Sequence, residues 1–160
     1  MAIGGIVETF EYVLEGDRDL DEKLQTVFHV KRMSLHERNK LAAEAGNKRL
    51  SKTGRTKKLS PSDADFFDRE AWPSIVEKVE NYFIPVSSED SVLSHFKLND
   101  SSEKIMFKVV NKNLEFFRID SVADEKGLDI IRKMMTPEQV NEVIEFSESI
   151  GTLTANEKKD

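Results

Sequence analysis

The stretch Gln25–Leu41, "QTVFHVKRMSLHERNKL", changes its periodicity halfway through. Residues 26–31, "TVFHVK", place alternate side chains on opposite faces, which is typical of a strand. Ser34 then opens a capping box, "SLHE", in which its hydroxyl accepts a hydrogen bond from the backbone N–H of Glu37 and the Glu37 carboxylate accepts one in return. The stretch therefore predicts a strand that runs directly into a capped helix, which we expect to end near Gly46.

A second strand is expected before this stretch. Residues 6–14, "IVETFEYVL", are rich in β-branched and aromatic side chains, and Gly16 and Asp17 supply turn chemistry after them. Two strands joined by a polar connection favour an antiparallel hairpin, and an isolated hairpin needs another element to pack on. We therefore expect the capped helix to fold back over the hairpin.

Helical spacing returns near Ser62. Apolar and aromatic residues between Phe66 and Phe83 recur at intervals of three and four, which predicts a helix with a broad apolar face. Pro73 should kink or split this helix because it lacks a backbone donor, and Pro85 should end it. The segment "SSEDSVLSHF" then predicts a short helix.

The C-terminal half also contains a predicted hairpin and a predicted helix. Residues 105–110, "IMFKVV", and 114–119, "LEFFRI", flank "NKN", which favours two strands joined by a three-residue loop. Thr136, Pro137 and Gln139 then supply a cap, a proline at the first helical position and a reciprocal glutamine. We expect this last helix to reach about Ser149, with Gly151 after it.

These elements predict an α+β protein with an N-terminal antiparallel β-hairpin packed on helices and a mainly helical remainder that holds a second β-hairpin. Residues 1–47 form the hairpin and the capped helix, and 48–60 form a basic flexible loop. Residues 61–153 form the helical part, with the hairpin at 105–119, in one domain with 1–47. Residues 154–160 are a polar tail.

Composition limits the classes of function. The 160 residues carry a net charge of −6 and no cysteine. Phosphate binding needs concentrated Lys and Arg, so nucleic acid is disfavoured as a partner, and disulfides and thiolate metal sites are excluded. No stretch has the length and apolarity of a membrane span, and the first residues lack a basic leader. We expect a cytosolic protein.

Motifs for catalysis or cofactor binding are absent. The three histidines show no metal-ligand spacing, and Asp17, Asp19 and Asp21 lack the glycine and closing glutamate of a calcium loop. No phosphate-binding glycine loop and no serine nucleophile elbow occurs. We therefore expect a protein that is not an enzyme and that holds no metal and no cofactor.

Two groups of residues are candidates for binding a partner. One is aromatic, although such a stripe can equally form a core. Its members are Phe66, Phe67, Trp72, Tyr82 and Phe83. The other lies in the basic loop, which can equally be a solvated segment. Its members are Lys48, Arg49, Lys52, Arg55, Lys57 and Lys58. In addition, Phe116 and Phe117 must point to opposite faces of a strand, so that one of them needs a cover other than the core of the hairpin.

Three separated pieces, about half of the chain, resemble the tail assembly chaperones of long-tailed bacteriophages. Residues 28–41, "FHVKRMSLHERNKL", are similar to the strand that enters an "xL(T/S)xxER" turn and a helix in that family. The segment "SIVEKVENYFIPVSSEDSVLSHF" loosely matches its aromatic helix. The C-terminal "MTPEQVNEVIEFSESIGTLTANEKKD" matches its Pro-led helix and polar tail. In two departures from the family pattern, Trp72 precedes the usual tryptophan position and the hairpin at 105–119 is an insertion.

The resemblance implies a non-enzymatic phage tail assembly chaperone in the host cytoplasm. Such a protein binds the tape-measure protein and recruits tail-tube subunits, and the family often makes a longer product by frameshifting. Two alternatives stay open. One is a structural component of the virion, such as a neck, connector or baseplate subunit. The other is a small acidic inhibitor of a host defence protein. Homo-oligomerisation also stays open.

Overall fold

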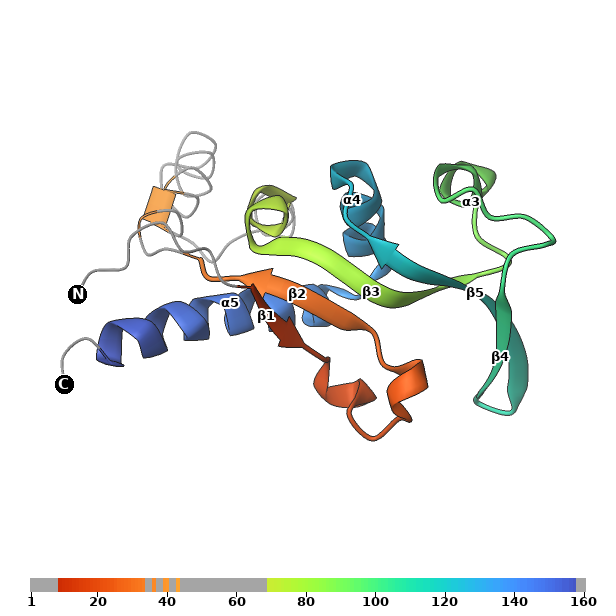
Figure 1. Ribbon diagram of the computed structural model, residues 1–160, viewed down its shortest axis with the longest axis horizontal. Helices are drawn as coiled ribbons and strands as arrows, with labels where there is room; N and C mark the ends of the chain where they lie inside the picture. Colours follow the sequence, from red (N-terminus) through yellow and green to blue (C-terminus); the bar gives the residue numbers. More distant parts are fainter. Residues whose placement is uncertain (1–8, 34–35, 37–38, 41–42, 44–68, 158–160) are drawn as a thin grey trace, which may run out of the picture.

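The protein is described by a computed structural model, in which a five-stranded antiparallel sheet carries helices on one face (Figure 1). The description covers residues 9–33, 36, 39–40, 43 and 69–157, without side chains beyond residue 150. The strand order is β1-β2-β3-β5-β4. The strands are β1 (Thr9–Tyr12), β2 (Val27–Lys31), β3 (Val76–Pro85), β4 (Lys104–Val109) and β5 (Lys112–Val122).

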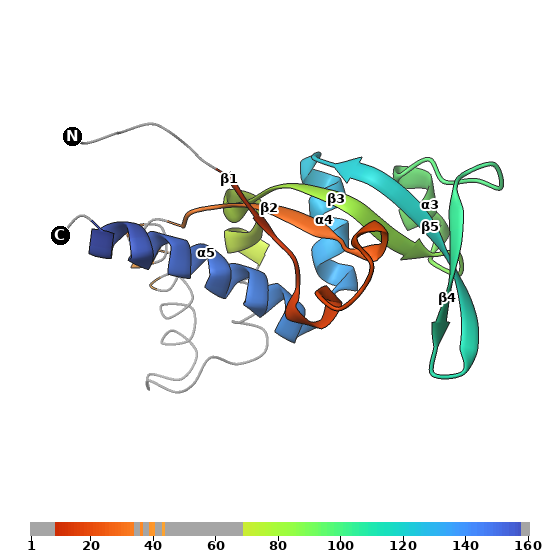
Figure 2. The same ribbon diagram turned by 60° about the horizontal axis from the view of Figure 1, so that its bottom comes forward.

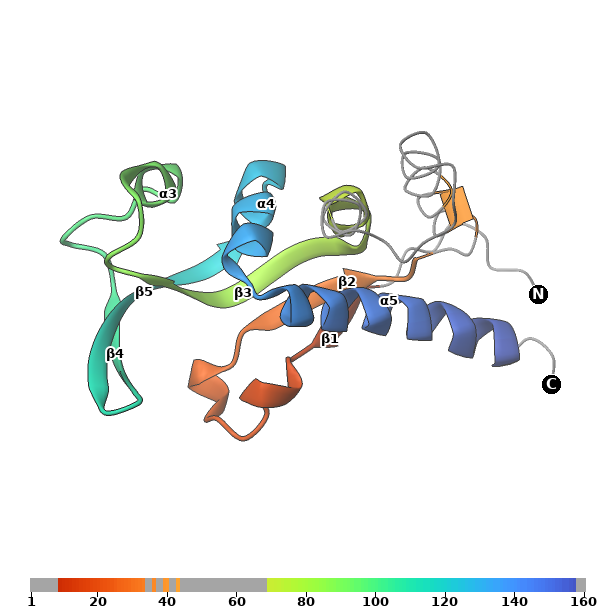
Figure 3. The same ribbon diagram turned by 180° about the vertical axis from the view of Figure 1, so that it is seen from behind.

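The helices lie on one face of the sheet. Residues 69–75 are helical and lead directly into β3. The other α-helices are α3 (Asp90–His95), α4 (Glu125–Met134) and α5 (Pro137–Glu157). Two 3-10 turns, Glu15–Asp17 and Glu22–Leu24, link β1 to β2. In Figure 1 the sheet lies in front of α4 and α5, and in Figure 3, seen from behind, these helices lie in front of the sheet.

The hydrophobic core fills the space between the sheet and the helices. Trp72, only 1% exposed, packs edge-to-face on Phe28 with 6.2 Å between the ring centroids. Its indole Nε1 donates a hydrogen bond of 3.0 Å to the carbonyl oxygen of Leu128 in α4, so the buried polar group is satisfied. The most deeply buried neighbours are Val30, Ile75, Val79, Ile131 and Val143.

The α5 helix is fixed to the edge of the sheet by polar and aromatic contacts. The Tyr12 hydroxyl donates to Glu142 Oε2 at 2.7 Å, and its ring stacks on Phe146 at 4.3 Å. Burial, the hydrogen bond to Glu142 and the charge of Glu142 raise the pKa of Tyr12 to about 12. Fully buried Ser147 donates to the Lys31 carbonyl oxygen at 2.7 Å. These contacts hold α5 against β1 and β2.

The predicted capping box at the start of α5 is confirmed. The Thr136 backbone N–H donates to Gln139 Oε1 at 3.1 Å, and the Gln139 N–H donates to Thr136 Oγ1 at 3.2 Å. The helix continues through Gly151 to Glu157, so the predicted end near Ser149 is wrong. One glycine in a helix costs only about 1 kcal/mol, which does not stop it.

The prediction of one broken helix from 62 to 83, and of a mainly helical remainder, is wrong. The helix ends at Ile75, two residues after Pro73, and Val76–Pro85 is the long third strand of the sheet. Pro85 therefore ends a strand. The short helix predicted in "SSEDSVLSHF" is confirmed as α3.

The second hairpin is confirmed, with a tighter turn than predicted. β4 and β5 pair from Lys104 with Phe117 to Val109 with Lys112, so the loop is Val110–Asn111 rather than "NKN". Both loop residues have positive φ, 47° and 65°, as a type I′ turn requires. Figure 2 shows this hairpin projecting beyond the rest of the sheet.

The N-terminal part agrees with the prediction only in its strands. β1 and β2 pair antiparallel, but they form one side of a larger sheet rather than a separate hairpin. The capped helix over 34–46 lies largely outside the described residues, and the basic loop over 48–60 lies wholly outside them. No helix in the described part of the chain has the length and apolarity to cross a membrane.

Candidate functional site

The sheet has one face toward the core and one that α4 and α5 leave open. Phe117 and its cross-strand partner Ile84 are buried on the core face. Because strand side chains alternate, Phe116 and its partner Pro85 point to the open face. The register of β4 and β5 places Phe107, together with Ile105, on this same face.

An aromatic patch occupies the open face, and we define it as Phe83, Phe107 and Phe116. Phe83 meets Phe107 edge-to-face at 5.2 Å between centroids, and Phe107 meets Phe116 in the same manner at 5.3 Å. All three side chains are half-buried, and none belongs to the hydrophobic core. Apolar rings gathered on an exposed face are typical of a surface that contacts another protein.

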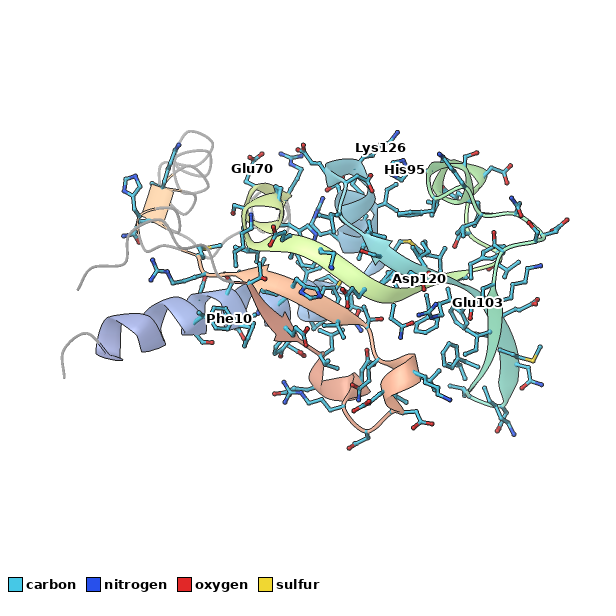
Figure 4. All side chains as sticks on the ribbon, in the orientation of Figure 1. Phe10, Glu70, His95, Glu103, Asp120 and Lys126 are labelled. Carbon is cyan, nitrogen blue, oxygen red and sulfur yellow. The ribbon has the colours of Figure 1, made fainter. Side chains whose placement is uncertain are left out.

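A polar network fixes the base of the β4–β5 hairpin beside the patch. Arg118 Nε donates to Asn81 Oδ1 at 2.6 Å, and Arg118 NH1 pairs with Glu103 at 3.2 Å and with Asp120. Burial lowers the pKa of Arg118, but its carboxylate partners outweigh this effect and raise it overall. Figure 4 shows Glu103 and Asp120 near the root of the hairpin. The guanidinium is therefore occupied by internal partners.

Asn81 is the centre of this network. Its φ of 56° is left-handed, which asparagine tolerates better than most residues. Its Nδ2 donates to the carbonyl oxygens of Lys23 and Gln25, at 2.8 and 2.9 Å, and its own carbonyl accepts from Thr26 Oγ1 at 2.9 Å. The side chain thereby joins the β1–β2 connection to the hairpin.

The rest of the open face is charged. Lys78 Nζ lies 2.7 Å from Glu80 Oε1, and His29 Nε2 lies 3.3 Å from the same oxygen. The hydrogen bond from Lys78, the largest effect, and the contact with His29 together lower the pKa of the Glu80 carboxyl against the opposing effect of burial. The open face is therefore divided into a charged part over β2 and the first half of β3 and an aromatic part over the end of β3, β5 and β4.

The structure separates the aromatic residues predicted from the sequence. Trp72 lies in the core and presents almost no surface to another chain. Tyr82 packs against the core, where burial raises its pKa to about 12. Phe83 alone of the three lies in the aromatic patch. The remaining predicted residues lie outside the described part of the chain: Phe66, Phe67, Lys48, Arg49, Lys52, Arg55, Lys57 and Lys58.

Phe107 and Phe116 were not among the predicted site residues. The signal that finds Phe116 is its adjacency to Phe117, because two successive aromatic residues in a strand cannot share one face. Phe107 follows once the register of the hairpin is known, since it lies beside Phe116 across the pair.

A shallow hollow lies beside α4. Its volume is about 500 Å³, and charges of both signs line it, among them Arg69, Glu70, Lys126 and Asp129. Figure 4 shows Glu70 and Lys126 at the upper edge of the molecule. Within the described residues, no group of three or more His, Asp or Glu side chains has a metal-binding arrangement. The hollow has no convergent set of ligands that favours one substrate.

Comparison of the chain with protein-family models, with curated proteins and with solved structures finds no match.

Proposed function

We propose that this protein acts by binding other proteins, as a non-enzymatic assembly chaperone for tape-measure and tail-tube proteins of a long-tailed phage. The observation that carries the binding role is the aromatic patch, which is a packed set of half-exposed rings on a sheet face that α4 and α5 leave open. The phage assignment rests on the sequence resemblance. In this proposal the patch covers apolar surface of an unassembled partner.

The physical properties of the patch suit a reversible contact. Half-buried phenyl rings lose little conformational entropy on binding, because each has only two side-chain torsions and its neighbours already restrict them. The neighbouring charged part of the open face, with Lys78 and Glu80, supplies a polar rim. A chaperone needs this combination, since it must release its partner during assembly.

The test is co-expression with the tape-measure protein of a long-tailed phage. We expect the two proteins to co-elute in size-exclusion chromatography, and we expect Phe107→Ser to abolish the complex. Leu20→Ser is the matched control, because Leu20 is also exposed but lies in the β1–β2 connection. Circular dichroism establishes that both variants fold. If Phe107→Ser and Leu20→Ser retained the complex equally, the patch would not be the binding site.

A structural virion subunit is the second candidate, and the projecting β4–β5 hairpin favours it. Projecting hairpins can serve as arms that neighbouring subunits bind in an assembly. Mass spectrometry of purified virions separates the two functions. A chaperone is absent from the finished particle, whereas a neck, connector or baseplate subunit is present in it.

A further inference from the structure

We propose that the outer edge of β4 takes up an extended, acidic segment of a partner protein as an additional strand of the sheet. This inference deepens the proposed function and rests on it for the role of this end of the sheet in binding protein. It adds the mode of binding and the chemistry of the partner segment. The geometry of β4, its charge and the conformation of the hairpin tip each support it.

The hydrogen-bond pattern identifies which backbone groups of β4 are directed outward. The Arg118 N–H donates to the Glu103 carbonyl oxygen at 3.1 Å, which marks Glu103 and Arg118 as a hydrogen-bonded pair. Such pairs alternate along an antiparallel ladder, so Ile105, Phe107 and Val109 bond to β5. The outward N–H and C=O groups therefore belong to Lys104, Met106 and Lys108.

These outward groups have no neighbouring strand in the described structure, because β4 ends the strand order. An edge strand of this kind is a template on which another chain can pair. The Met106 side chain is 62% exposed beside this edge.

The charge of the hairpin selects the partner. β4 carries two lysines, Lys104 and Lys108, and no acidic residue, and Lys112 opens β5, in which Glu115 lies across from Met106. Lys104 and Lys108 lie on the same face of the edge strand. A partner strand with carboxylates at alternate positions would place them opposite these ammonium groups, and opposite charges across a strand pair stabilise it. The segment we propose therefore alternates Asp or Glu with apolar residues.

The tip of the hairpin supplies a second observation. Val110 has a φ of 47° and is 89% exposed. A β-branched residue is disfavoured in the left-handed region, and glycine or asparagine would suit this turn better. A strained and exposed apolar residue is a marker of function rather than of stability.

Charge and ring geometry favour an acidic protein segment over two other occupants. A second copy of this chain would bring the same lysines to the edge and repel it. Single-stranded nucleic acid would need free cations beside flat ring faces. Lys104 and Lys108 lie on the face of β4 opposite Phe107. On the face of the aromatic patch, Arg118 is occupied by Asn81, Glu103 and Asp120, and the rings pack edge-to-face on one another.

The probe is a fluorescein-labelled synthetic peptide that alternates glutamate with valine and is long enough to pair with all of β4. We expect fluorescence anisotropy to show saturable binding to the full-length protein. Two matched peptides carry N-methyl groups on alternate amides, one on each edge of the strand. Only methylation of the edge that faces β4 should abolish binding. Equal binding by both methylated peptides would overturn strand addition.

Met106 gives a matched pair of protein variants. Met106→Pro removes one outward N–H without removing a hydrogen bond to β5, and proline is tolerated at such edge positions. We expect it to weaken peptide binding about tenfold, the effect of about one hydrogen bond and the fit around it. Met106→Ala removes the same side chain but keeps the N–H, and should bind nearly as the wild type does. Equal loss in both variants would overturn the backbone role.

The charge is tested separately. Lys104→Glu combined with Lys108→Glu should weaken the binding of the glutamate peptide about tenfold at low salt and less at high salt. Lys126→Glu, on α4, is the control of equal type and should leave it unchanged. Peptide binding that ignores the double reversal would overturn the acidic assignment, and so would tighter binding of an oligothymidylate or a monomer–dimer equilibrium through β4.

These outcomes are distinguishable from failure of the proposed function. If Phe107→Ser abolishes the tape-measure complex while Met106→Pro leaves it intact, the aromatic patch binds the partner and strand addition at β4 is wrong. If the tape-measure protein does not bind but the acidic peptide adds to β4 with the expected methylation pattern, the edge site stands and the phage assignment is wrong.

Discussion

Two aromatic clusters in this molecule use the same contact geometry for different ends. In the core, Phe28 and Trp72 meet edge-to-face beneath the helices and are almost fully buried. In the aromatic patch, Phe83, Phe107 and Phe116 meet in the same way but remain half-exposed. The two clusters differ in whether helices bury them, and not in the geometry of their ring contacts.

This difference indicates that one part of the sheet contributes mainly to stability and another part mainly to binding. The β1–β2–β3 side carries the helical layer, which is fixed to it by Tyr12, Trp72 and Ser147. The β4–β5 hairpin extends past that layer. Substitutions in the covered cluster should therefore change the free energy of unfolding, whereas substitutions in the patch should chiefly change binding.

The largest expected effect is that of Trp72→Ala. Removing a fully buried indole should lower the free energy of unfolding by about 3–5 kcal/mol, because it leaves a cavity and removes the hydrogen bond to Leu128. Phe107→Ala should cost about 2 kcal/mol, since its ring is only partly buried. Urea unfolding followed by far-ultraviolet circular dichroism measures both. Equal costs would break the distinction between the two clusters.

The stability of the helical layer should depend on pH in the acidic range through Asp124, which joins α3 and α4. This residue caps α4 by accepting from the Gly127 N–H at 2.8 Å, and it contacts His95 of α3 at 2.8 Å. Burial raises the pKa of Asp124, but the bonds from Gly127 and His95 outweigh it and lower the pKa below 3.8. Because the folded-state pKa is depressed, this stabilisation is present above pH 3.8 and is lost as the pH falls below it.

Asp124→Ala should lower the free energy of unfolding by about 1.5 kcal/mol at neutral pH through loss of the cap and of the hydrogen bond with His95. Asp124→Asn keeps a capping acceptor but not the charge, so it should cost less. Urea titrations at neutral and acidic pH compare the three proteins. If the wild type and Asp124→Asn lost stability in parallel as the pH fell, the charge of Asp124 would not contribute.

The contact between α5 and the sheet should depend on pH in the alkaline range through Tyr12. Its pKa is raised from 10.0 to about 12, so its stabilisation is full below pH 10 and is lost as the pH rises toward 12. Tyr12→Phe should lower the free energy of unfolding by about 1 kcal/mol at neutral pH, because the bond to Glu142 is lost. The difference between variant and wild type should shrink in alkali. A constant difference would argue against this link.

The smallest expected effect has the opposite sign and lies in the exposed hairpin. Val110→Asn should raise the free energy of unfolding by about 0.5 kcal/mol, since asparagine tolerates the left-handed conformation that Val110 adopts. Chemical denaturation measures the gain. A loss of stability would show that the turn does not impose this conformation in solution.

Local chemical signals in the sequence predicted several elements well. The capping box of Thr136 and Gln139 and the hairpin around Asn111 involve residues close in the chain, so no tertiary information is needed to find them. The exact turn was missed, because Val110 is a poor residue for its left-handed position. Turn propensities do not predict a β-branched residue in a left-handed position, so a turn that contains one is missed from sequence.

The third strand was missed for a different reason. The buried residues of β3 are Val76, Val79 and Ile84, with intervals of three and five instead of two. A register shift near Val30 and the left-handed Asn81 change which side chains face the core. The resulting spacing imitates a helix, and only the partner strands reveal the irregularity.

The candidate site was predicted in fragments. Phe83 was chosen together with Trp72 and Tyr82 because all three lie in one apolar run, yet the sheet directs Phe83 to the opposite face. The adjacency of Phe116 and Phe117 placed them on opposite faces of β5, and Phe116 packs on Phe107 of the same hairpin. What joins Phe83 to Phe107 is the pairing of strands far apart in the chain, which no local pattern contains.

The location of Trp72 gives the molecule an internal optical reporter. It is the single tryptophan of the chain, and it lies between the sheet and α4. Its emission should therefore shift to the red when the helical layer separates from the sheet. The same emission should change little when a ligand docks on the distant β4–β5 hairpin, so one spectrum distinguishes opening of the interior from occupancy of the surface.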